Sequence, residues 1–293
     1  MTPRQDPIRL AIRLVVFLVS FFVLYLVLSG LLSWLLLNFA GPMFAELVSA
    51  LCATWLALRI YEGFRVIDVG LWWNRASGDN LALGLLGGAG AACLVLGLPL
   101  LFGWARIVQN HPASAEGIAF ALLCLAAGSI GEELLFRGYG FQLLVAALGP
   151  WAAVVPVGIL FGVMHSANPD ASRLGLVNTA AFGVLFGFAY LRSRDLWLPF
   201  GLHFGWNLTL PLFGVNLSGI TIFKEITGHE MTWRAGGLWS GGAYGPEASL
   251  LTSIMFVPLF VFLWKAPVRR QTSPLTDPPA EGAICESSPP SLS

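Results

Sequence analysis

Residues 14–37 read LVVFLVSFFVLYLVLSGLLSWLLL, and this stretch decides the class of fold. An α-helix rises about 1.5 Å per residue, so about 20 consecutive apolar residues cross the hydrocarbon core of a bilayer. The stretch is long enough to do so, and no small-x-small cleavage site closes it. We therefore expect a retained membrane anchor rather than a signal peptide.

Seven further apolar stretches follow, near residues 43–60, 81–103, 117–146, 150–166, 174–191, 196–213 and 249–264. Together they predict an all-α, polytopic membrane protein with about eight transmembrane helices. The composition agrees, because 56% of the residues are apolar and only 11% are charged, against about 25% in a soluble domain. We predict one membrane domain over residues 1–265. Residues 266–293 are rich in Pro, Ser and acidic residues, so we expect a disordered cytoplasmic tail there.

The basic residues alternate between the two sides of the predicted spans. Most lie on the side that both termini share, whereas Arg106, Arg173, Lys224 and Arg234 lie on the other. Because cytoplasmic loops accumulate Lys and Arg, we predict a protein integral to the cell membrane with both termini in the cytoplasm. The net charge of zero offers no basic surface, which excludes nucleic-acid binding. The expected partners are membrane lipid and a membrane-associated protein or peptide.

Ionisable residues within three of the spans are the candidates for function. Such a side chain costs about 2.5 to 3.5 kcal/mol on insertion scales, so it needs a partner, a wet cavity or a chemical role. The polar groups are Glu132, Glu133 and Arg137 in the fourth span, His165 in the fifth, and His203 and Asn207 in the seventh.

Helix geometry separates the roles of these residues. Glu133 stands one turn before Arg137, which predicts an internal ion pair. Glu132 points about 100° away, with Phe136 one turn after it, so it has no cation on its own face. Such a carboxylate must either be protonated or find a polar partner on another helix. The available partners are His165 and His203.

A lone membrane histidine usually makes an interhelical hydrogen bond, but two histidines and an unpaired glutamate together favour a shared site. Asn207, one turn after His203, can orient that imidazole or donate to an oxyanion. Phe161, one turn before His165, is expected to serve packing rather than chemistry. Counted along straight helices, Glu132 and His165 lie at similar depths of about 21 and 22 Å, whereas His203 is roughly 10 Å too shallow. A tilt or a deeper start of the seventh span would close that gap.

The same spans contain closely spaced glycines. Gly158 and Gly162 in the fifth span, and Gly183 and Gly187 in the sixth, each form a small-xxx-small face. Such faces let two helices approach closely, which a site assembled from several helices requires.

Three motifs stand in order on successive apolar stretches: Glu132-Glu133-x-x-x-Arg137, Phe161-x-x-x-His165 and His203-x-x-x-Asn207. This arrangement resembles the CAAX-processing and bacteriocin-processing (CPBP) family of intramembrane proteases, which includes the type II CAAX prenyl endopeptidases. The resemblance implies an eight-helix enzyme whose site lies among helices 4, 5 and 7 and whose cavity opens toward the cytoplasmic leaflet. It implies an endopeptidase that cleaves near the C-terminus of a membrane-associated, possibly prenylated CAAX-type, protein or peptide.

The resemblance also implies a role for each matched residue. Glu132 would activate water and His165 would help to hold it. His203 and Asn207 would stabilise the tetrahedral oxyanion, with Glu133 and Arg137 in support.

Two questions stay open from the residues alone. Glu132, His165 and His203 form a possible zinc set, so the enzyme is either a metalloprotease or a glutamate peptidase with no obligatory metal, and we favour the second. The alternative functions are a non-catalytic membrane scaffold or bacteriocin-immunity protein, and a transporter in which buried Glu and His titrate in turn.

Overall fold

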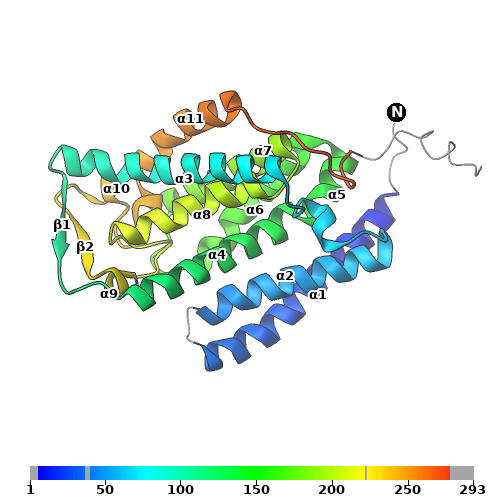
Figure 1. Ribbon diagram of the computed structural model, residues 1–293, viewed down its shortest axis with the longest axis horizontal. Helices are drawn as coiled ribbons and strands as arrows, with labels where there is room; N and C mark the ends of the chain where they lie inside the picture. Colours follow the sequence, from blue (N-terminus) through cyan, green and yellow to red (C-terminus); the bar gives the residue numbers. More distant parts are fainter. Residues whose placement is uncertain (1–5, 37–39, 222, 278–293) are drawn as a thin grey trace, which may run out of the picture.

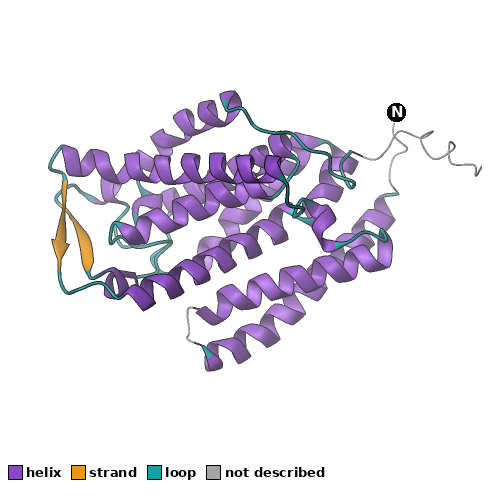
Figure 2. Cartoon of the chain, in the orientation of Figure 1, coloured by secondary structure: helices purple, strands orange, loops and turns teal. Residues whose placement is uncertain are grey.

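The computed structural model describes residues 6–36, 40–221 and 223–277, and most of them are helical (Figures 1 and 2). The principal helices are α1 (Pro7–Leu35), α2 (Ala40–Tyr61), α3 (Arg75–Leu101), α4 (Ala115–Arg137), α5 (Tyr139–Leu148), α6 (Pro150–Met164), α7 (Arg173–Ser193), α8 (Trp197–Leu212) and α11 (Leu250–Lys265). The shorter elements are η1 (Val66–Val69), β1 (Ala105–Gln109), η2 (His165–Ala167), α9 (Phe223–Thr227), β2 (His229–Trp233), α10 (Gly237–Ser240) and η3 (Pro246–Ala248).

Helices occupy all eight predicted stretches, but not all of them are long enough to count as membrane spans. Six candidates among the described residues are long and apolar enough to cross a membrane: α1, α2, α3, α4 with α5, α6 with η2, and α7. Helix α11 is apolar but has only 16 residues, and α8 also has 16. Both are shorter than the roughly 20 residues that a full crossing needs. The structure therefore supports six to seven spans.

Side-chain caps fix where several of these helices begin. Asn74, Ser114, Ser172 and Ser249 precede α3, α4, α7 and α11 and accept hydrogen bonds from free backbone N–H groups of the first turn. Such caps satisfy donors that would otherwise lack a partner at the helix start.

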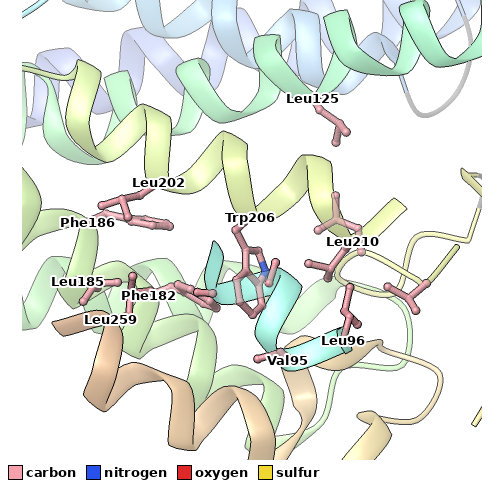
Figure 3. Close-up of a cluster of buried hydrophobic side chains, with 14 of the residues drawn as sticks. Val95, Leu96, Leu125, Phe182, Leu185, Phe186, Leu202, Trp206, Leu210 and Leu259 are labelled. Carbon is pink, nitrogen blue, oxygen red and sulfur yellow. The ribbon is translucent and has the colours of Figure 1, made fainter. Parts of the chain in front are cut away.

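Helices α3 and α8 pack with their backbones almost in contact. A Cβ atom at Gly84 or Gly88 would collide with the carbonyl oxygens of Leu198 and Leu202, and one at Gly201 would lie 2.6 Å from the Leu81 oxygen. This crossing places Trp206 of α8 in a buried cluster with Val95 and Leu96 of α3 and with side chains of α7 and α11 (Figure 3). The cluster holds α8, which carries two of the predicted site residues, at the centre of the bundle.

The predicted close approach of the fifth and sixth stretches is confirmed at the crossing of α6 and α7. A Cβ at Gly158 would lie 2.6 Å from the backbone nitrogen of Val184, and one at Gly183 would lie 2.7 Å from Cα of Gly158. Only glycine fits at this separation, so the glycines set the distance between the two helices.

The fourth stretch is not one continuous helix. It breaks at Gly138, where a Cβ atom would collide with the carbonyl oxygen of Leu134. The side chain of Gln142 then donates to the Arg137 carbonyl at 3.1 Å and to the Val69 carbonyl at 2.7 Å. A depth counted along one straight helix therefore does not apply to residues 117–146.

A small sheet departs from the all-α expectation. Strands β1 and β2 pair antiparallel from Ala105 opposite Trp233 to Gln109 opposite His229. They lie at the end of the molecule farthest from the N-terminus (Figure 1). The segment between α8 and α11 contains β2, the short helices α9 and α10, and η3.

The span ends predicted to share one membrane side do meet in space. Arg13 pairs with Glu62 at 3.1 Å, and Asp195 accepts hydrogen bonds from Asn80 and from Gln271. Residues 266–277, the first part of the predicted tail, are placed here, with Arg194 paired to Asp277 at 3.4 Å. Residues 278–293 lie outside the described residues. Which side of the membrane this end faces stays a prediction.

Candidate active site

Helix α4 carries the first motif, and its predicted ion pair is confirmed. Arg137 Nη1 donates to Glu133 Oε1 at 3.2 Å, and both side chains are fully buried. Arg137 Nη2 donates to the Gly183 carbonyl at 2.9 Å, and the guanidinium lies 4.7 Å from the ring centre of Phe161. The pair therefore ties α4 to α6 and α7.

His203 of α8 completes a buried triad with these two residues. Its Nδ1 lies 2.9 Å from Glu133 Oε1, and the ring stacks on Phe186 with centroids 4.9 Å apart. Because a carboxylate only accepts hydrogen bonds, we assign the Nδ1 proton to this bond. The other ring nitrogen, Nε2, lies 3.7 Å from Glu132 Oε2. These contacts close the depth gap left by counting along straight helices.

Glu132 lies on the cavity side of α4, away from the ion pair. Its side chain is 22% exposed, and its Oε2 makes no hydrogen bond within the described residues. The distance to His203 Nε2 is longer than a hydrogen bond, so the carboxylate is free to bind a further group such as a water molecule.

His165 stands at the C-terminal end of α6, where η2 begins. Its Nδ1 lies 2.8 Å from the carbonyl oxygen of Phe161, which again places the proton on Nδ1 and leaves Nε2 as the acceptor of a neutral ring. Phe161 is buried, with its ring 4.7 Å from that of His165 and 6.0 Å from that of His203. The geometry agrees with the packing role predicted for Phe161.

Asn207 lies one turn after His203 on α8. Its amide Nδ2 is 3.5 Å from the hydroxyl of Ser129 on α4, a long contact that holds the amide only loosely.

One cavity of about 480 Å³ joins these groups. Glu132, His165, His203 and Asn207 all line it. The other ionisable side chains along its wall are Tyr25, Glu46 and Glu247. Apolar side chains, mostly of α1, α2, α4 and α7, make up much of the remainder, and Ser129, Asn168, Thr179 and Ser218 add uncharged polar groups. The direction in which the cavity opens, expected toward the cytoplasmic leaflet, stays a prediction.

Two acidic residues of this cavity were not among the predicted site residues. Glu46 stands inside a predicted span, so the rule that picked out Glu132 could also have found it. Glu247 belongs to η3, in a segment where the sequence carries no recognisable signal.

Glu247 is held by a specific set of donors. Its Oε2 accepts from the backbone N–H of Ser218 at 2.6 Å and from the Ser218 hydroxyl at 2.8 Å. Ser218 adopts a left-handed backbone with φ of 49°, which presents both donors to the same oxygen. Burial raises the pKa of Glu247, while the hydrogen bonds from Ser218 oppose the rise.

The possible zinc set does not fit the geometry. Among the residues that the structure describes, no three His, Cys, Asp or Glu side chains are grouped to hold one metal ion. Glu132 and His203 lie near each other, but the set with His165 does not form such a group. We therefore derive no step of the chemistry through a metal.

Comparison with known proteins agrees with the three motifs. Residues 113–209 match the family model described as "Type II CAAX prenyl endopeptidase Rce1-like". The "Putative membrane peptidase YdiL" of Bacillus subtilis (strain 168) is 27% identical over 143 residues, which cover 47% of this chain and 56% of that protein. The "Uncharacterized protein YyaK" of the same organism is 27% identical over 131 residues, which cover 40% and 42%.

The chain thus spans about half the length of the curated relatives that it matches. All seven motif residues, from Glu132 to Asn207, lie within the segment that matches the family model. Over residues 113–209 the chain therefore carries a domain of the Rce1-like type II CAAX prenyl endopeptidase (CPBP) family.

Proposed function

We propose that this protein is an intramembrane endopeptidase that hydrolyses a peptide bond near the C-terminus of a membrane-associated, possibly prenylated, protein or peptide. The observation that carries the proposal is the position of Glu132. Its Oε2 atom makes no hydrogen bond within the described part of the chain, and the residue lines a cavity that also contains His165, His203 and Asn207. The proposed enzyme is integral to the cell membrane, has both termini in the cytoplasm, and uses α8 and α11 to complete eight spans.

Glu132 acts as the general base. It takes one proton from a water molecule as the water oxygen attacks the carbonyl carbon of the substrate. The Nε2 atom of neutral His165 accepts the second hydrogen of that water and so orients it.

His203 and Asn207 stabilise the oxyanion of the tetrahedral intermediate. With Nδ1 donating to Glu133, His203 can donate from Nε2 only as an imidazolium. The loosely held amide of Asn207 supplies a second donor, and preorganised donors of this kind are a major source of rate enhancement.

Comparison of cleaved protein termini in cells tests this function even while the substrate is unidentified. Cells with the wild-type protein should contain new C-termini that are absent from cells with Glu132→Ala or His165→Ala at equal membrane abundance. If the wild-type and both variant cells have the same termini, the protein is not a peptidase, and the scaffold or immunity role would then explain the family domain.

A further inference from the structure

A second carboxylate, Glu46, lines the same cavity as Glu132, and it comes from outside the segment that matches the family. Helix α2 crosses α4 next to Gly131, where a Cβ atom would lie 2.9 Å from the backbone nitrogen of Leu47 and 3.2 Å from the carbonyl carbon of Glu46. Gly131 directly precedes Glu132. The contact of the two backbones therefore brings Glu46 and Glu132 together.

Both carboxylates enter the same cavity, and each acts electrostatically on the other. Within the described part of the chain, Glu46 makes neither an ion pair nor a hydrogen bond, and its other electrostatic neighbour is the hydroxyl of Tyr25. Arg137 is committed to Glu133 and the Gly183 carbonyl. Glu46 thus has no cation to balance it.

Two carboxylates that share a site poor in water repel each other when both are ionised, and such a pair keeps one proton. Their unequal surroundings indicate where that proton lies. Tyr25 interacts electrostatically with both carboxylates, but Glu132 also lies 3.7 Å from the Nε2 atom of His203, whereas the charged neighbour of Glu46 is Glu132 itself. Of the two carboxylates, Glu132 has an imidazole nitrogen close by and Glu46 has no cation near it, so the shared proton is placed on Glu46.

We propose that Glu46 is a further catalytic residue, the general acid that protonates the leaving amine. This inference rests on the proposed peptidase function. In the first step the water oxygen bonds to the carbonyl carbon and one water proton passes to Glu132. In the second, the C–N bond breaks, its electron pair stays on nitrogen, and that nitrogen takes the proton of Glu46.

The cycle then closes without any further reactant. After the amine leaves, Glu132 carries a proton and Glu46 is ionised. Transfer of that proton from Glu132 to Glu46 restores the starting pair, and the net reaction is the addition of one water molecule across the peptide bond.

The test uses the full chain in proteoliposomes and a farnesylated, CAAX-type peptide with a fluorophore and quencher across the scissile bond. We expect Glu46→Gln to lower kcat about 10² to 10⁴-fold, the usual contribution of a positioned acid, with little change in KM. Glu46→Asp should restore part of the rate. Glu116→Gln, which removes an exposed carboxylate at the start of α4, is the matched control and should behave as the wild type.

Infrared difference spectroscopy of the same samples detects the shared proton without any substrate. The carbonyl stretch of a protonated carboxyl group should appear in the wild-type minus Glu46→Gln spectrum and be absent from the wild-type minus Glu116→Gln spectrum. Both readouts differ from a loss of folding, because glutamine resembles a protonated glutamate in shape and charge and should leave the thermal unfolding temperature of Glu46→Gln equal to that of the wild type.

The possible failures are distinguishable. If the wild type cleaves the peptide and Glu132→Gln does not, while Glu46→Gln retains the wild-type kcat, the role of Glu46 is overturned and the peptidase function stands. If the wild type does not cleave the peptide, the CAAX-type substrate of the proposed function fails. In that case the infrared band still decides whether Glu46 holds a proton, and its absence overturns the inference.

Discussion

The Nδ1 atom of His203 and the Nη1 atom of Arg137 share one acceptor, the Oε1 atom of Glu133, at 2.9 and 3.2 Å. One buried carboxylate thus fixes the imidazole that faces Glu132 and the guanidinium that ties α4 to α7. In this family domain the first motif therefore has two functions: Glu133 builds the site, and Glu132 remains free to act in it.

Replacement of Glu133 should destabilise the protein. Glu133→Gln leaves the buried charge of Arg137 without its partner, and breaking a buried pair in this way costs about 3 to 5 kcal/mol. Thermal unfolding in detergent should therefore show a large fall in the midpoint. The double variant Glu133→Gln, Arg137→Met should recover part of the loss, and a single variant as stable as the wild type would contradict the role assigned to the pair.

Asn207 offers a test of the oxyanion donors. Asn207→Ala should lower kcat about 10² to 10³-fold with little effect on KM, because the lost hydrogen bond forms mainly in the transition state. Ser129→Ala removes only the long contact to the Asn207 amide and should have a much smaller effect. An equal loss in the two variants would instead indicate that the position of the amide, rather than its hydrogen bond to substrate, limits the rate.

Glu247 should make the stability of the protein depend on pH. Burial raises its pKa in the native state, so between the pKa of an unfolded glutamate, about 4.3, and the native value the native state binds more protons than the unfolded state. Its contribution to stability is full below the unfolded pKa and is lost as pH rises through the native pKa. Unfolding midpoints of the wild type should thus fall, relative to Glu247→Gln, over this range. A constant difference between the two proteins across the range would refute this assignment.

The α3–α8 crossing supplies a prediction about packing, with a control on the same helix. Gly88→Val would drive its side chain into the backbone of α8 at Leu202 and Trp206, and overpacking of this kind costs about 1 to 3 kcal/mol. A Cβ atom at Gly90 would meet no neighbouring segment within 4 Å, so Gly90→Val should be tolerated. Equal unfolding midpoints for the two variants would argue against the close crossing.

The residues of the first motif show what the sequence could predict. Helical spacing alone paired Glu133 with Arg137, left Glu132 without a partner on its own helix, and pointed to a histidine from another helix as that partner. These relationships follow from the fixed 100° rotation per residue, which holds wherever a helix forms.

Other features depend on contacts between distant segments, which no local pattern records. The pairing of β1 with β2 joins residues more than 100 positions apart. Glu247 is held at the cavity by hydrogen bonds from the backbone N–H and the hydroxyl of Ser218, which lies 29 positions away. The helix breaks at Gly138 in a backbone conformation that only glycine allows, because a Cβ atom there would collide with the Leu134 carbonyl oxygen. An apolar count over 117–146 could not reveal such a break.

The rate of peptide cleavage by purified Glu132→Gln protein, measured beside the wild type at matched thermal stability, tests the proposed role of Glu132 most directly. Because glutamine keeps the shape of the side chain but cannot take a proton from water, we predict a fall in kcat of about 10² to 10⁴-fold. A Glu132→Gln protein that cleaves the peptide at the wild-type rate would contradict the assignment of Glu132 as the general base.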